Sequence, residues 1–142
     1  MPTRRSSAVW EGGLKDGNGS YKVGSGAVGG VYSFGSRFEE ESGSNPEELL
    51  AAAEAACYSM ALSIGLEKEG SPATKVETSA ACTIEKVGEG FKITRMALTV
   101  VATVPGLDPA KFQAIAAATK EGCPVSAALK GNVTIDLDAK LG

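Results

Sequence analysis

Residues 49–66 are the feature that most constrains the fold, because Ala, Leu and Met dominate this stretch and Glu54 is its only charged residue. A helix start precedes it. Asn45 can cap a helix, Pro46 suits the first helical position, and Glu47 and Glu48 favour the positive end of the helix dipole. A helix that is apolar all round has to be buried on nearly every side. We therefore expect a central helix from Asn45 to Leu66, covered by a sheet and by a second subunit.

The first third of the chain is rich in glycine and lacks helical periodicity. Short apolar runs between glycines predict an antiparallel sheet of three strands, at Ser7–Trp10, Ser20–Val23 and Val31–Phe34. Residues 24–29 match the dinucleotide fingerprint G-x-G-x-x-G, which requires a helix directly after it to receive the pyrophosphate. Residues 30–35 instead resemble a strand, so we interpret the glycines as a hairpin.

The chain after the central helix alternates between strand and helix patterns. Apolar residues share one parity around 76–84, and Cys82 belongs to that apolar face. Later signals include a glycine turn and helix starts at prolines. They predict a turn at 88–90, a strand over 91–104, a helix from Asp108-Pro109 to Gly122, a short helix from Cys123-Pro124 to Leu129, and a strand over 132–137. The predicted class is α+β, with one domain over residues 1–142.

Composition excludes several functions. A net charge of -3 with no basic cluster argues against nucleic acid as a partner. The chain has no histidine, which removes Ser–His and Cys–His nucleophile pairs and His-ligated zinc sites, and we expect neither a metal nor a cofactor. We see no apolar run of the roughly 20 residues that a membrane helix needs, and no signal peptide after Arg4 and Arg5. The expected protein is soluble, cytoplasmic and not bound to a membrane.

After these exclusions, the three cysteines are the remaining candidates for a reactive group. An odd number of cysteines in a reducing compartment argues against a structural disulfide framework. Cys123 precedes Pro124 at a helix start, where a thiolate is stabilised, although a small capping residue fits there equally well. Cys57 is either a reactive thiol or a small apolar residue of the central helix. Cys82 is interpreted as a core residue.

Two long motifs resemble the osmotically inducible protein family, OsmC. Residues 45–63 are similar to the signature helix of that family, and residues 121–126 match its second motif in the right order and separation. Trp10-Glu11-Gly12 and Arg37-Phe38-Glu39 match as well, so the similarity covers nearly the whole chain. Glu48 and Val125 favour the OsmC branch over the sister organic hydroperoxide resistance branch, Ohr.

The resemblance implies a thiol-dependent peroxidase acting in oxidative or osmotic stress defence. Cys57 resembles the peroxidatic cysteine and Cys123 the resolving cysteine, while Arg37 and Glu47 occupy the places of the arginine and glutamate that assist the thiol. Cys82 has no role in the family pattern. The implied fold has antiparallel sheets wrapped around a long buried helix in an intertwined homodimer. Organic hydroperoxides are the implied substrates, ahead of hydrogen peroxide, and a dithiol, with dihydrolipoyl groups suggested, is the reductant.

The residues are consistent with that chemistry. A thiolate is the nucleophile toward peroxide, and burial in an apolar helix would raise the pKa of Cys57. A nearby cation is then needed, which Arg37, expected in a loop and held by a bidentate pair with Glu47, can supply. Glu47 and Cys57 are ten residues apart on one helix, about 15 Å along its axis and roughly 80° from eclipsed. If they act together, we expect the glutamate to come from a second, antiparallel subunit.

Two other functions stay open from the residues alone. The apolar interior could carry a small hydrophobic molecule, with incidental cysteines, or the cysteines could form a redox-sensing disulfide without turnover. Turnover of a hydroperoxide with a dithiol separates the peroxidase from both alternatives.

Overall fold

The computed structural model describes all 142 residues, Met1–Gly142. Contacts within the chain divide it into two compact units, Met1–Leu49 and Leu50–Gly142, which are described separately below. The elements, in chain order, are β1 (Ser6–Glu11), β2 (Asn18–Val23), β3 (Gly29–Tyr32), α1 (Phe34–Phe38), α2 (Pro46–Lys68), β4 (Lys75–Val87), β5 (Gly90–Thr103), α3 (Pro109–Gly122), α4 (Pro124–Leu129) and β6 (Thr134–Leu141). The α+β class is confirmed, whereas a single domain over 1–142 stays a prediction.

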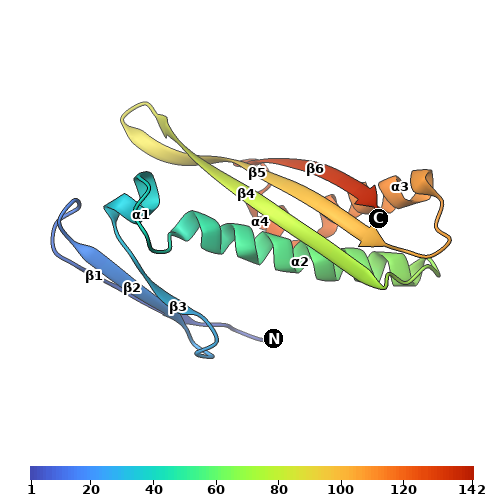
Figure 1. Ribbon diagram of the computed structural model, residues 1–142, viewed down its shortest axis with the longest axis horizontal. Coiled ribbons are helices and arrows are strands. Elements are labelled where there is room, and N and C mark those ends of the chain that lie inside the picture. Colours follow the sequence, from blue (N-terminus) through green and yellow to red (C-terminus); the bar gives the residue numbers. More distant parts are fainter. The chain divides into compact units, whose positions relative to one another are not determined.

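The first unit contains the antiparallel sheet β1–β2–β3 (Figure 1). The glycines at 24–29 connect β2 to β3, and the Val23 N–H donates to the Val28 carbonyl at 3.0 Å. Gly26 has φ +77°, a conformation that glycine adopts without strain. The fingerprint-like motif is therefore a hairpin, as expected, and strand β3 follows it directly in place of the helix that would receive a pyrophosphate.

The third expected strand ends earlier than predicted, because a short helix begins inside it. Ser33 caps α1, its hydroxyl accepting the Ser36 N–H at 3.1 Å while the Ser36 hydroxyl accepts the Ser33 N–H at 2.8 Å. This reciprocal pair is a capping box. Arg37 consequently lies in helix α1, and the prediction that places it in a loop is wrong.

Helix α2 begins where the sequence predicts and runs slightly further, to Lys68. The Asn45 side chain caps it by accepting the Glu48 N–H at 2.8 Å. By length and composition alone α2 is long and apolar enough to span a membrane, a test that the core helix of a soluble protein also passes, and this corrects the expectation that no apolar run reaches that length. The difference arises because the helix is 23 residues long and Glu54 is the only charge in its central part.

The single chain buries only one side of α2, whereas the expected burial on nearly every side includes a second subunit. Tyr58, Leu62 and Leu66 are fully buried. The opposite side is exposed and consists mainly of small and apolar residues, namely Ala52, Ala53, Ala56, Met60, Ser63 and Ile64. The second unit therefore leaves an apolar face of α2 uncovered.

The second unit contains the sheet β4–β5–β6 (Figure 1). β4 and β5 form the expected antiparallel hairpin, turning at Gly88 with φ +62°. β6 pairs with β5 in parallel, which corrects the expectation of purely antiparallel sheets. The reason is that α3 and α4 connect β5 to β6, and parallel neighbours need such a crossover. β6 also extends past the predicted end at 137, because the alternation of inward and outward residues continues to Leu141.

The core lies between α2, the inner face of β5 and α3. The Tyr58 hydroxyl, on α2, donates to the Ala116 carbonyl of α3 at 2.9 Å, and the Ser59 hydroxyl bonds to Thr78 of β4 at 2.7 Å. Buried apolar side chains fill the space, namely Met96, Leu98, Val100, Ala102, Phe112 and Ala116. These contacts fix the rotation of α2 about its axis, and hence the direction of its cysteine.

Candidate active site

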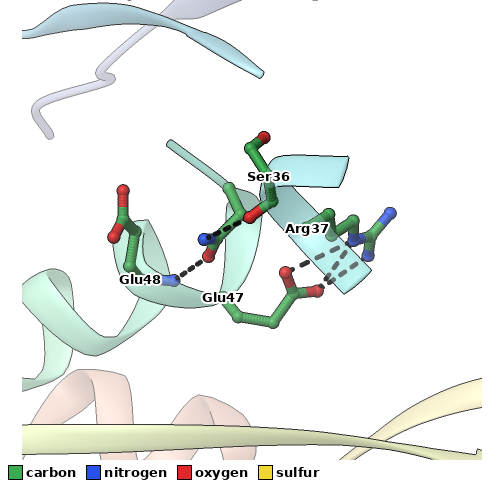
Figure 2. Close-up of polar contacts among 5 residues, drawn as sticks. Ser36, Arg37, Glu47 and Glu48 are labelled. Atoms are coloured by element: carbon green, nitrogen blue, oxygen red, sulfur yellow. Dashed lines mark hydrogen bonds and ion pairs between the residues drawn. The ribbon is translucent and has the colours of Figure 1, made fainter. Parts of the chain in front are cut away.

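Arg37 and Glu47 form an ion pair within the first unit (Figure 2). The Arg37 Nη2 and Nε atoms donate to Glu47 Oε1 at 2.8 and 3.1 Å, and Nε lies 3.3 Å from Oε2. The Glu47 residue is 5% exposed, while about a third of the Arg37 side chain is exposed. The pair predicted from the sequence is thus present within one chain, and it fixes the plane of the guanidinium.

The ends of α1 and α2 hold this pair in place. Asn45, besides capping α2, donates from its amide to the Ser36 carbonyl at 3.2 Å. The Ser36 hydroxyl donates to the Ser44 carbonyl at 2.7 Å. Glu47 lies in the first turn of α2, where the helix dipole favours a negative charge. The two helix ends are therefore joined around the carboxylate that receives Arg37.

An aromatic cavity of about 180 Å³ lies beside the Arg37 side chain. The guanidinium carbon of Arg37 is 5.1 Å from the centre of the Phe38 ring. The lining residues are Trp10, Leu14, Tyr32, Ser33, Phe34, Arg37 and Phe38. Sequence reasoning missed this cavity, and the available signal was the spacing of Phe34 and Phe38, which share a helix face at i and i+4.

Cys57 and Cys123 meet in the second unit, with their sulfur atoms 3.0 Å apart. Cys57 projects from α2 and is half-buried, whereas Cys123 is fully buried between the end of α3 and the start of α4. A disulfide has an S–S length of about 2.05 Å, so the sulfurs need to approach by only about 1 Å to bond. The two cysteines from distant motifs are therefore placed together as thiols.

The surroundings of Cys57 disfavour its thiolate. Burial raises its pKa, and the hydrogen bond with Cys123 raises it further. The backbone N–H of Val125 acts in the opposite direction, while the charges of Cys123 and Glu54 again raise the pKa. None of these influences comes from a cation.

Cys82 lies on β4 and packs against the hydrophobic core, opposite Met96 in the strand register. Its interpretation as a core residue is confirmed. Sequence reasoning missed a different pair, Glu54 and Ser126, which form a buried hydrogen bond between α2 and α4. The signal for it was Glu54 itself, because a lone charge within an apolar helix requires a partner.

Comparison with known proteins gives a consistent result. Residues 39–138 match the family model described as OsmC-like protein. The chain is 44% identical over 138 residues to Peroxiredoxin OsmC of Escherichia coli, covering 96% of both chains. It is 35% identical over 103 residues to Organic hydroperoxide resistance protein OhrB of Bacillus subtilis, covering 72% of this chain and 74% of that one.

Solved structures are similar to this chain as well. The crystal structure of OhrB of Bacillus subtilis superposes with a TM-score of 0.71 at 27% identity, covering 96% of this chain and 98% of that one. An organic hydroperoxide resistance protein from Elizabethkingia anophelis superposes with a TM-score of 0.78 at 23% identity, covering 100% and 98%. The second similarity concerns the fold alone.

Proposed function

We propose that this chain, which belongs to the OsmC family, is a cysteine-based peroxidase that reduces organic hydroperoxides with Cys57 and resolves the product with Cys123. The names of its relatives support a role in peroxide reduction and hydroperoxide resistance. The single observation that carries the two-cysteine mechanism is the 3.0 Å separation of the two sulfurs, contributed by residues 66 positions apart. A carrier of hydrophobic molecules would not need this arrangement.

The first step oxidises Cys57. Its thiolate attacks one peroxide oxygen, the O–O bond breaks, and the departing alkoxide takes a proton to become an alcohol. Two electrons pass from sulfur to the peroxide, and Cys57 is left as a sulfenic acid.

The second step forms the disulfide. The Cys123 sulfur attacks the Cys57 sulfur, the S–O bond breaks, and the departing hydroxide takes the Cys123 proton to form water. An external dithiol then reduces the disulfide by thiol–disulfide exchange and becomes a disulfide itself. A dihydrolipoyl group is our candidate for this dithiol, and a reducing cytoplasm stays the predicted compartment.

Arg37 supplies the positive charge that the thiolate needs, and Glu47 keeps the guanidinium oriented. The aromatic cavity beside Arg37 can receive the apolar part of a substrate, which supports organic hydroperoxides over hydrogen peroxide. We propose that the Arg37–Glu47 pair of one subunit serves Cys57 of the other in a homodimer. The exposed apolar face of α2 supports such a partner.

Cys123→Ser tests the resolving step. We expect one rapid turnover of an organic hydroperoxide, followed by inactivation as the unresolved sulfenic acid is oxidised further to sulfinic acid. Intact-mass spectrometry after peroxide treatment should show added oxygen on the variant and loss of two hydrogens in the wild type. If the variant sustains turnover at the wild-type rate, Cys123 is not the resolving residue. A wild-type disulfide without turnover would instead indicate a redox sensor.

Arg37→Lys tests the activation of the thiol. The charge is kept, but an ammonium group lacks the planar fork that pairs with Glu47, so we expect a much lower rate of peroxide reduction. The Cys57 pKa should rise, which moves the pH profile of its alkylation to higher pH. Cys82→Ser together with Cys123→Ser, with and without Arg37→Lys, isolates Cys57 in this assay. An unchanged profile would show that another group activates the thiol.

A further inference from the structure

Glu54 is a buried carboxylate with an incomplete set of partners. Its side chain is fully buried, although charged residues are rarely buried unless they are paired. One oxygen, Oε1, accepts a hydrogen bond from the Ser126 hydroxyl, while the other, Oε2, has no hydrogen-bond partner. Burying a carboxylate in this way is costly, which suggests a function for it beyond packing.

The Glu54–Ser126 bond joins the same two elements as the reactive cysteines. Glu54 precedes Cys57 by three positions on α2, so both side chains lie on one face of that helix. Ser126 follows Cys123 by three positions, in the first turn of α4, which Cys123 precedes as the N-cap residue. The Ala127 N–H donates to the Cys123 carbonyl at 2.9 Å, which keeps that turn closed. The start of α4 is thus attached to α2 at two neighbouring points.

We propose that Glu54 and Ser126 are positioning residues for disulfide formation, holding the first turn of α4 against α2 so that Cys123 stays aligned with Cys57. This inference rests on the proposed function. Once Cys57 carries an oxygen atom, the sulfenic acid needs more room than the thiol, and the buried Cys123 has to attack from the side opposite the S–O bond. Misplacement of reacting atoms by about 1 Å can reduce a rate by about 100-fold.

The effect of Glu54 on Cys57 argues against a role in activating the thiol. The negative charge of Glu54 raises the pKa of Cys57, and therefore disfavours the thiolate that starts the reaction. The carboxylate thus works against the first step, although it lies three positions from Cys57 on the same helix. A contribution to the second step, through Ser126, accounts for both its position and its hydrogen bond.

The decisive variant is the double substitution Glu54→Met and Ser126→Ala. Replacing both partners of a buried polar pair by apolar groups of similar size is often neutral for stability, whereas removing Ser126 alone would leave the carboxylate unpaired. We expect the double variant to form its sulfenic acid readily but to form the disulfide about 10- to 100-fold more slowly than the wild type. Over-oxidised Cys57 should accumulate with each turnover. Rapid quenching after one equivalent of tert-butyl hydroperoxide, followed by mass spectrometry, separates the two steps.

Two further variants make the result specific. Glu54→Gln removes the charge but keeps an oxygen that can accept from Ser126, so it should restore disulfide formation toward the wild-type rate. In Glu54→Gln and in the double variant Glu54→Met with Ser126→Ala, the alkylation profile of Cys57 should move to lower pH, because the negative charge of Glu54 has been removed. The pair Glu89→Met and Ser79→Ala makes the same residue changes at exposed positions and serves as the control for composition.

The outcomes distinguish a failure of this inference from a failure of the proposed function. If the wild type forms no Cys57–Cys123 disulfide, the proposed function fails. If the wild type forms it and the double variant forms it equally fast, the positioning role is wrong and the peroxidase survives. Should the double variant not unfold cooperatively, Glu54→Gln with Ser126→Ala replaces it, because both groups are then neutral and the hydrogen bond is still lost.

Discussion

Cys57→Ser is expected to abolish peroxide reduction, leaving only the uncatalysed rate. A hydroxyl is hardly ionised at neutral pH and cannot take up the oxygen that a thiolate sulfur accepts. The rest of the site should survive, because serine is close to cysteine in size and Cys57 is only half-buried. The measurement is steady-state consumption of tert-butyl hydroperoxide in the presence of several dithiols, with dihydrolipoamide among them.

Cys82→Ser is the matched control for this prediction. Cys82 packs against the core on β4, so its replacement should cost some stability while leaving turnover nearly intact. Peptide mapping of the oxidised wild type should identify a bond between Cys57 and Cys123. A high yield of any disulfide that contains Cys82, or sustained turnover by Cys57→Ser, would overturn the assignment of the two reactive cysteines.

Much of the chain from the start of α2 onward could be predicted from the sequence, because its signals are local. Asn45-Pro46 and Asp108-Pro109 mark helix starts, and both caps are present, with Asp108 accepting the Lys111 N–H at 3.1 Å. The alternating parity of β4 matches its burial. The parallel pairing of β6 was missed because pairing depends on where the crossover returns the chain, which strand composition does not specify.

The candidate site, too, could be predicted from the sequence only in part. The Arg37–Glu47 contact was expected from the resemblance to the OsmC family, in which this arginine and glutamate act together. The helical conformation at Arg37 was missed because Ser33 and Ser36 form a capping box whose second member is serine, not the usual glutamate or glutamine. The Glu54–Ser126 bond joins residues 72 positions apart, and a single sequence contains no local pattern that pairs them.

The second large effect concerns the assembly of the site from two subunits. Glu47 and Cys57 belong to the same helix, α2, ten positions apart, which corresponds to about 15 Å along a helix axis. Pairing two copies of α2 antiparallel across a two-fold axis would bring Glu47 of each copy toward Cys57 of the other. It would also cover an exposed face that includes Met60, at 70% exposure, and Ile64, at 43%. We therefore expect a homodimer with two composite sites.

Mixing two inactive variants tests the composite site directly. Glu47→Ala leaves Arg37 without its partner, and Cys57→Ser removes the nucleophile, so each homodimer should be inactive. In a heterodimer, one site would combine the intact Glu47 of one chain with the intact Cys57 of the other, so about half of the heterodimer sites should work. Unfolding and refolding the variants together should therefore restore about a quarter of the wild-type rate, because random pairing makes about half of the dimers mixed. A monomer in sedimentation at micromolar concentration, or a refolded mixture as inactive as its components, would show that Glu47 acts within its own chain or only stabilises the start of α2.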